Sequence, residues 1–174
     1  MTATSTAPED APLSRVRRSR ALRRAYLTGL CVVLAAGLLG LLGVHTRDVT
    51  ARGLDGYELT VHYADRSRPG LATPWSVEVR RAEGFDNSFR IATTASYFDS
   101  FDENGLDPEP ASASVEGDFI VWEFEPPEGQ VFTLSFDARI EPAVQSLWPP
   151  EAITRLVIEG ETIAEVRYRT RVFP

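Results

Sequence analysis

Lysine is absent from this 174-residue chain, and cysteine and histidine are scarce. Without lysine there is no Ser-x-x-Lys nucleophile, and no serine lies in a Gly-x-Ser-x-Gly elbow. Cys31 is the only cysteine, and His45 and His62 are the only histidines, so the usual zinc ligand sets are missing. We therefore predict no catalytic, cofactor or metal-binding residues and no enzymatic activity.

Positive charge is concentrated at the start of the chain. Residues 1–24 contain six arginines against Glu9 and Asp10, whereas residues 49–174 contain 11 arginines against 22 acidic residues. The acidic main part of the chain argues against nucleic acid as a partner, because phosphate binding requires a basic surface.

An uncharged apolar run separates these two parts, from Tyr26 to Val44. As a helix, 19 residues extend about 28 Å, close to the thickness of the hydrocarbon core of a bilayer. The sequence therefore predicts a transmembrane helix over residues 25–45, and the preceding arginines place the N-terminus in the cytoplasm. We expect residues 1–24 to be a disordered basic tail. Residues 46–56 would be a short linker to an extracytoplasmic domain over 57–174.

Three other interpretations of this run are signal sequences. Cleavage near Ala51 remains an alternative, although the apolar run is longer than in most signal peptides. A lipoprotein signal is rejected because Leu30 precedes Cys31 and the cysteine lies near the start of the run. The pair Arg23-Arg24 resembles a twin-arginine signal, but the very hydrophobic run favours arginines that set membrane topology.

The periodicity of the sequence changes to two after residue 55. Apolar residues alternate with polar ones in at least five stretches, near residues 57–63, 75–80, 120–124, 132–140 and 164–172. Turn-forming residues separate these stretches, and Glu159-Gly160 predicts a hairpin that joins 156–158 to 163–172. With about seven strands and no outer helix, we predict an all-β, antiparallel β-sandwich.

Residues 119–140 add a resemblance to a known class. In this stretch a strand that contains Trp122 leads through Pro126-Pro127-Glu128-Gly129 into a long alternating strand. It resembles the immunoglobulin-like domains of bacterial surface proteins. The resemblance implies an immunoglobulin-like sandwich with an adhesive, spacer or docking role, although the tandem repeats typical of that class are absent.

Three smaller features of the outer domain are ambiguous. The acidic segment Asp99–Pro110 contains enough oxygen ligands for calcium but lacks the EF-hand spacing, so we interpret it as a solvated loop. Trp148-Pro149-Pro150 is either a partner contact or a cover for the end of the sandwich. The arginines at positions 167, 169 and 171 are expected to pair with glutamates on facing strands.

These features favour a non-enzymatic role at the plasma membrane. We expect a single-pass cell-envelope protein whose partners are the lipid bilayer and another membrane or envelope protein. The first alternative is a secreted or anchored ligand-binding module, for which calcium is one candidate ligand. The second is an unrecognised envelope enzyme, which would have to unite His62 with carboxylates.

Overall fold

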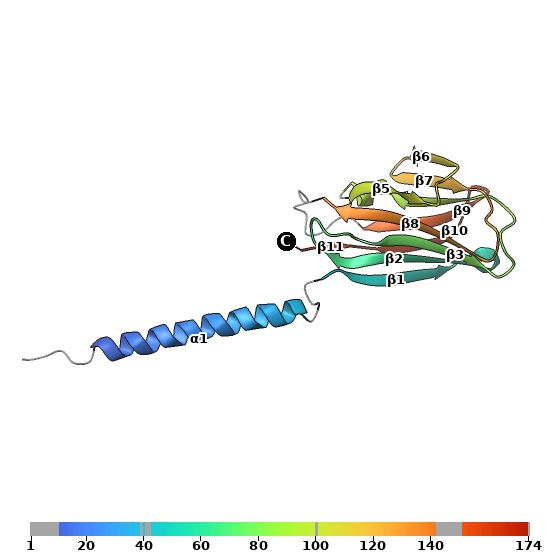
Figure 1. Ribbon diagram of the computed structural model, residues 1–174. Helices are drawn as coiled ribbons and strands as arrows, with labels where there is room; N and C mark the ends of the chain where they lie inside the picture. Colours follow the sequence, from blue (N-terminus) through green and yellow to red (C-terminus); the bar gives the residue numbers. More distant parts are fainter. Residues whose placement is uncertain (1–10, 39, 41–42, 100, 142–150, 174) are drawn as a thin grey trace, which may run out of the picture. The chain divides into compact units, whose positions relative to one another are not determined.

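The computed structural model describes residues 11–38, 40, 43–99, 101–141 and 151–173 (Figure 1). The chain divides into two units, residues 1–43 and residues 44–174. The first unit contains helix α1 (Ala11–Leu38). The second contains all the strands.

Helix α1 begins earlier than the sequence suggested. Residues 11–24, expected to belong to a disordered tail, are helical, which fits the strong helix propensity of alanine, leucine and arginine. Residues 1–10 lie outside the described part of the chain, as do residues 39, 41 and 42 of the expected membrane span. Among the described residues, no helix combines the length and the apolar character that a membrane span requires.

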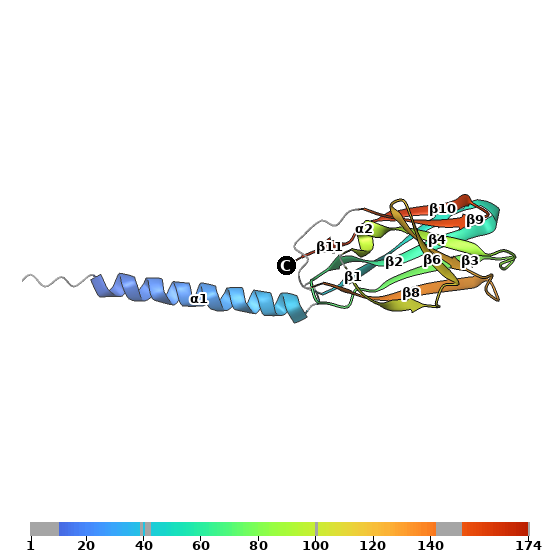
Figure 2. The ribbon, with the colours of Figure 1, turned by 90° about the horizontal axis from the view of Figure 1, so that it is seen from above.

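The second unit is an all-β sandwich of two sheets (Figures 1 and 2). Sheet A has the order β1-β2-β3-β8-β5, and its strands are β1 (His45–Arg52), β2 (Tyr57–Ser67), β3 (Trp75–Arg81), β8 (Val131–Ile140) and β5 (Phe101–Asp107). Sheet B has the order β10-β9-β4-β7-β6, and its strands are β10 (Glu161–Tyr168), β9 (Ala152–Ile158), β4 (Phe89–Thr94), β7 (Phe119–Phe124) and β6 (Ser112–Glu116).

The core forms because alternate residues of both sheets are apolar and face each other. In β2 and β8 buried residues alternate with more exposed ones along most of each strand, as the period-two pattern predicted. Aromatic rings fill the centre, where Trp75 packs edge-on against Phe98 at 5.2 Å and Phe136 at 6.3 Å between ring centroids. Tyr97, Phe98 and Phe101 are also buried there.

Several boundaries differ from the predicted ones. Residues 46–52, expected within a linker, form most of β1, which pairs with β2 along its whole length. The expected strand 163–172 is divided, because β10 ends at Tyr168 and β11 (Arg171–Val172) joins sheet A, parallel to β2. A four-residue helix, α2 (Ala95–Phe98), stands where no outer helix was expected.

Turn chemistry explains the hairpins. At the predicted hairpin between β9 and β10, Glu159 and Gly160 both have positive φ, at 51° and 84°, as a type I′ turn requires. The β1–β2 hairpin contains the short 3-10 helix η1 (Leu54–Gly56), in which Asp55 has a φ of 52°. The segment 119–140 is not a hairpin, because β7 pairs within sheet B and β8 within sheet A.

Candidate functional site

The outer surface of sheet A carries short polar side chains in register across four strands. We call this surface the polar face. One row crosses β1, β2, β3 and β8 as Asp48, His62, Ser76 and Ser135, and the next as Thr50, Thr60, Glu78 and Thr133. Strand alternation places these residues opposite the buried set, so all are exposed or half-exposed.

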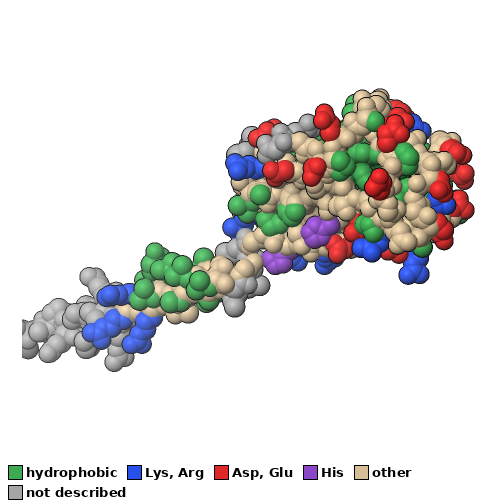
Figure 3. Space-filling model, turned by 45° about the vertical axis from the view of Figure 1, so that its right-hand side comes forward, with side chains coloured by type: hydrophobic (Ala, Val, Ile, Leu, Met, Phe, Trp, Pro, Cys, Tyr) green, Lys and Arg blue, Asp and Glu red, His purple; other side chains and the backbone are tan. Residues whose placement is uncertain are grey.

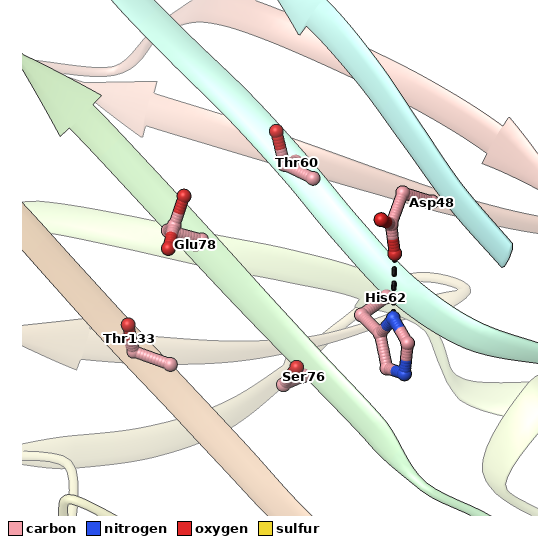
Figure 4. A pocket seen from close by; sticks show the side chains of 6 residues that line it. All are labelled: Asp48, Thr60, His62, Ser76, Glu78 and Thr133. Carbon is pink, nitrogen blue, oxygen red and sulfur yellow. Dashed lines mark hydrogen bonds and ion pairs between the residues drawn. The ribbon is translucent and has the colours of Figure 1, made fainter. Parts of the chain in front are cut away.

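One contact on the polar face joins His62 to Asp48. Nδ1 of His62 lies 2.5 Å from Oδ1 of Asp48, and both side chains are substantially exposed (Figure 4). Both histidine side chains are visible at the surface in Figure 3. A second contact, between the hydroxyls of Thr50 and Thr60, spans 2.9 Å between the same two strands. The polar face is thus partly organised by hydrogen bonds before any partner binds.

A shallow hollow of about 220 Å³ lies in this face (Figure 4). Its lining is formed by Asp48, Thr60, His62, Ser76, Glu78 and Thr133. Small-molecule sites usually enclose about 300–1,000 Å³ and are mostly apolar, so this hollow is small and polar by comparison. Its chemistry suits hydrogen bonding to a broad partner surface better than enclosure of a small ligand.

Asp48, His62 and Ser76 share one row, which raises the question of a catalytic triad. A triad needs the second imidazole nitrogen directed at the serine hydroxyl and donors for an oxyanion nearby. Figure 4 shows that nitrogen on the side of the ring away from Ser76. The surrounding backbone amides lie in the plane of the sheet, where they bond to neighbouring strands. The row therefore lacks the arrangement of a nucleophile and its base.

A second hollow, of about 250 Å³, lies on the outer surface of sheet B. Two of its lining residues are arginines that already have carboxylate partners. Arg155 donates to Glu165 at 2.8 Å and lies over the ring of Phe119, and Arg90 contacts Glu116 at 3.3 Å. The hydrogen bond from Arg155 is the main reason that the pKa of Glu165 lies below its ordinary value.

The acidic residues of the domain do not gather into a metal centre in the part of the chain that the structure describes. A hollow of about 250 Å³ at one end of the sandwich includes Asp55, Asp86, Glu159 and Glu161 among its lining residues. However, no group of three or more histidine, cysteine, aspartate or glutamate side chains in the described residues is placed to hold a metal ion. The segment Asp99–Pro110 is also not simply a loop, because residues 101–107 form β5 at the edge of sheet A.

The remaining sequence candidates are placed as follows. Arg167 donates to Glu165 at 2.9 Å, but this glutamate lies on the same strand rather than on a facing one. Arg171 lies opposite Arg66 in the register of β11 and β2. Trp148-Pro149-Pro150 lies outside the described residues. The site residue that sequence reasoning missed is Asp48, which it had placed beside the membrane span.

Comparisons with known proteins do not show a family to which this chain belongs. No protein-family model matches the chain, and no curated protein matches its sequence. The chain is similar in structure to a chain of the Coh-OlpA–Doc918 complex, a type I cohesin–dockerin complex from Clostridium thermocellum, with a TM-score of 0.40 and 12% identity over 74% of this chain and 99% of that one. It is also similar to a chain of the Coh-OlpC–Doc435 complex from the same organism, with a TM-score of 0.38 and 12% identity over 62% and 89% of the two chains.

Proposed function

We propose that this chain is a single-pass protein of the plasma membrane whose extracytoplasmic β-sandwich docks, without catalysis, on another membrane or envelope protein. The polar face is the observation that carries the docking role. Serine and threonine side chains have few rotamers to lose, so a partner that binds them sacrifices little conformational entropy. The finer identity that we propose for the domain is immunoglobulin-like, which rests on the resemblance of residues 119–140.

The anchor is proposed from the sequence. The run Tyr26–Val44 has no charged residue, and arginines precede it. The run ends at Val44, and β1 begins at the next residue, His45. A domain attached directly to the end of its anchor stays close to the bilayer, which favours a partner that is itself at the membrane.

The position of β1 bears on cleavage of the N-terminal segment. Cleavage directly after Ala51 would remove all of β1 except Arg52, although this strand pairs with β2 from His45 to Arg52. We therefore propose that the segment is retained. The intact mass of the protein purified from membranes tests this: a mass that corresponds to a chain beginning near residue 52 would overturn it.

A variant in the apolar run tests the anchor. We expect the full chain to stay with the membrane fraction during an alkaline carbonate wash. Replacement of both Leu30 and Leu34 by arginine should release it, because each charge strongly disfavours insertion, by about 3 kcal/mol at the centre of a helix. Replacement of the same leucines by alanine is the control. A wild-type chain that washes off would contradict the anchor.

Site-specific photo-crosslinking tests the docking role. A photoreactive residue at position 133 on the polar face should crosslink to one discrete protein in intact cells. The same residue at Thr162, an exposed position on sheet B, should not give that product. Thr133→Arg should then abolish co-purification in mild detergent while Thr162→Arg preserves it. A chain that purifies alone in several detergents and gives no position-dependent crosslink would overturn the proposal.

A further inference from the structure

Strand β6 is an edge strand with an unusual degree of exposure. It pairs only with β7, and all five of its residues, Ser112 to Glu116, are exposed. The other edge strands are β1 and β5 of sheet A and β10 of sheet B, and β1 and β10 contact each other. An exposed edge presents unpaired backbone N–H and C=O groups, which can pair with another strand.

Proteins usually disrupt such edges, and apart from β6 the described strands that end the two sheet orders are each disrupted. The register of β1 shifts between His45 and Thr46, that of β10 between Thr162 and Ala164, and that of β5 between Glu103 and Leu106. By contrast, β6 pairs with β7 without a shift, from Ser112 opposite Glu123 to Glu116 opposite Phe119. No proline or basic residue lies within β6. The described edges thus include one that remains regular and suited to strand addition.

The core-facing side of β6 is also uncovered. Ala113 lies opposite Trp122 and Val115 opposite Ile120, and both partners face the core side of sheet B. Val115 nevertheless is 70% exposed. An apolar side chain on the inner side of a sheet but open to solvent is favourable to cover. A strand added beside β6 would extend sheet B and bring its own inward side chains next to Val115.

The charge around this edge selects the chemistry of the added strand. Five exposed carboxylates lie on β6, on β7 and on the segments that flank them: Glu109, Glu116, Asp118, Glu123 and Glu125. The two arginines near β7 are already paired, Arg90 with Glu116 and Arg155 with Glu165. A segment that carries basic side chains would be attracted to this edge.

We propose that the β6 edge binds an extended segment of the partner protein, with basic residues on one side and apolar residues on the other. The inference rests on the proposed docking function and names the chemistry of the partner. It involves a surface separate from the polar face. A second copy of this chain fits poorly as the occupant, because pairing two β6 edges would bring two sets of carboxylates together.

The experiment uses residues 44–174, which contain the whole described core. The probe is a seven-residue peptide that alternates arginine and valine, and the matched peptide alternates glutamate and valine. Amide hydrogen exchange of Ala113 and Val115 is followed by NMR. At ten times its dissociation constant, the arginine peptide should slow exchange at these amides about tenfold, because only the unbound fraction exchanges. The glutamate peptide should leave exchange unchanged.

A pair of variants assigns the effect to β6. Val115→Lys places a charge on the inner side of the edge and should abolish the slowing. Val131→Lys changes another exposed valine, on β8, and should preserve it. Equal melting temperatures of the two variants establish that both are folded. If Val115→Lys does not fold, Ala113→Lys provides the same test, because Ala113 also lies on the inner side of β6.

Three results would overturn the inference. The first is that both peptides slow amide exchange in β6 equally. The second is that the arginine peptide still slows exchange in Val115→Lys. The third is that exchange slows without peptide as the protein dimerises in sedimentation velocity, which would assign the edge to a second copy. If the peptide has no effect on exchange but the crosslink from position 133 persists, the docking function still holds. Loss of that crosslink with the peptide effect intact would overturn the polar face as the docking site instead.

Discussion

The indole Nε1 of Trp75 donates a hydrogen bond of 2.7 Å to the phenolic oxygen of Tyr168, across 93 positions of the chain. Trp75 belongs to sheet A and Tyr168 to sheet B, so this bond joins the two layers inside the core. The hydroxyl of Thr154 lies 3.0 Å from the same phenolic oxygen. A buried polar group without a partner is costly, which makes this three-residue connection a specific determinant of how the sheets pack.

Removal of the Tyr168 hydroxyl should destabilise the domain. Tyr168→Phe leaves the buried indole N–H of Trp75 without its acceptor, and we expect a loss of about 1–3 kcal/mol in the free energy of unfolding. Tyr63→Phe is the matched control, because the Tyr63 ring packs on Tyr168 at 4.8 Å but no hydrogen bond of its hydroxyl is described. Urea unfolding of both variants measures the difference, and equal losses would contradict this role of the bond.

The buried tyrosines of the core predict a loss of stability in alkali. Burial raises the pKa of Tyr97 and of Tyr168 well above 10. Between pH 10 and the folded-state pKa, the unfolded chain releases phenolic protons that the folded chain retains. The stability is therefore complete below pH 10 and falls as the pH rises above it, by up to about 1.4 kcal/mol per pH unit for each tyrosine.

Urea titrations at intervals from pH 9 to 11.5 measure this dependence. Tyr168→Phe should reduce the slope above pH 10, since one of the phenols whose pKa is raised by burial is removed. A free energy of unfolding that stays constant up to pH 11.5 would show that burial of these phenols is not maintained.

Gly53 should not tolerate a side chain. A Cβ at this position would lie 2.6 Å from the carbonyl oxygen of Ile163, which is a backbone atom and cannot rotate away. Gly53→Ala should thus destabilise the domain by about 1–3 kcal/mol, the usual range for overpacking. Arg52→Ala, at a neighbouring exposed position, should change stability by less than about 0.5 kcal/mol. Thermal melts of both variants suffice, and an equally small effect of Gly53→Ala would contradict the close approach.

Calcium should leave the melting temperature unchanged. In the segment Asp99–Pro110, residues 101–107 form β5, which pairs with β8, and Asp102 lies opposite Arg139. Ligands that bind the folded state raise its melting temperature. With millimolar calcium we expect a shift below about 1 °C, within the scatter of repeated melts. An increase of several degrees that a chelator reverses would instead support the calcium-binding alternative.

The strands that sequence reasoning located are those in which burial alternates. Strands β2, β3 and β8 each have one face in the core, so their apolar residues recur at every second position. Strand β6 contains Ser-Ala-Ser-Val-Glu and is exposed throughout, and β5 is rich in acidic and turn-forming residues. Their strand conformation comes from pairing with neighbours distant in sequence, which a local pattern does not reveal.

The candidate site was predictable only in part. The alternation of β2 correctly placed His62 on the polar side of a strand. Its partner Asp48 lies 14 residues earlier, in a segment interpreted as a linker, and only the β1–β2 register brings the two together. Register depends on the hairpin around Asp55 and on a shift near Ala64, features that a single sequence does not determine.

The attachment of β1 and β11 has a mechanical consequence. Both strands pair with β2 at Arg66, where His45 lies opposite it in one register and Arg171 in the other. Tension between the two ends of the domain therefore acts on the hydrogen bonds of β1 one after another, beginning at His45, instead of loading them all together in shear. A domain that opens like a zipper yields at low force. It suits a stationary contact in the plane of a membrane better than a tether under load.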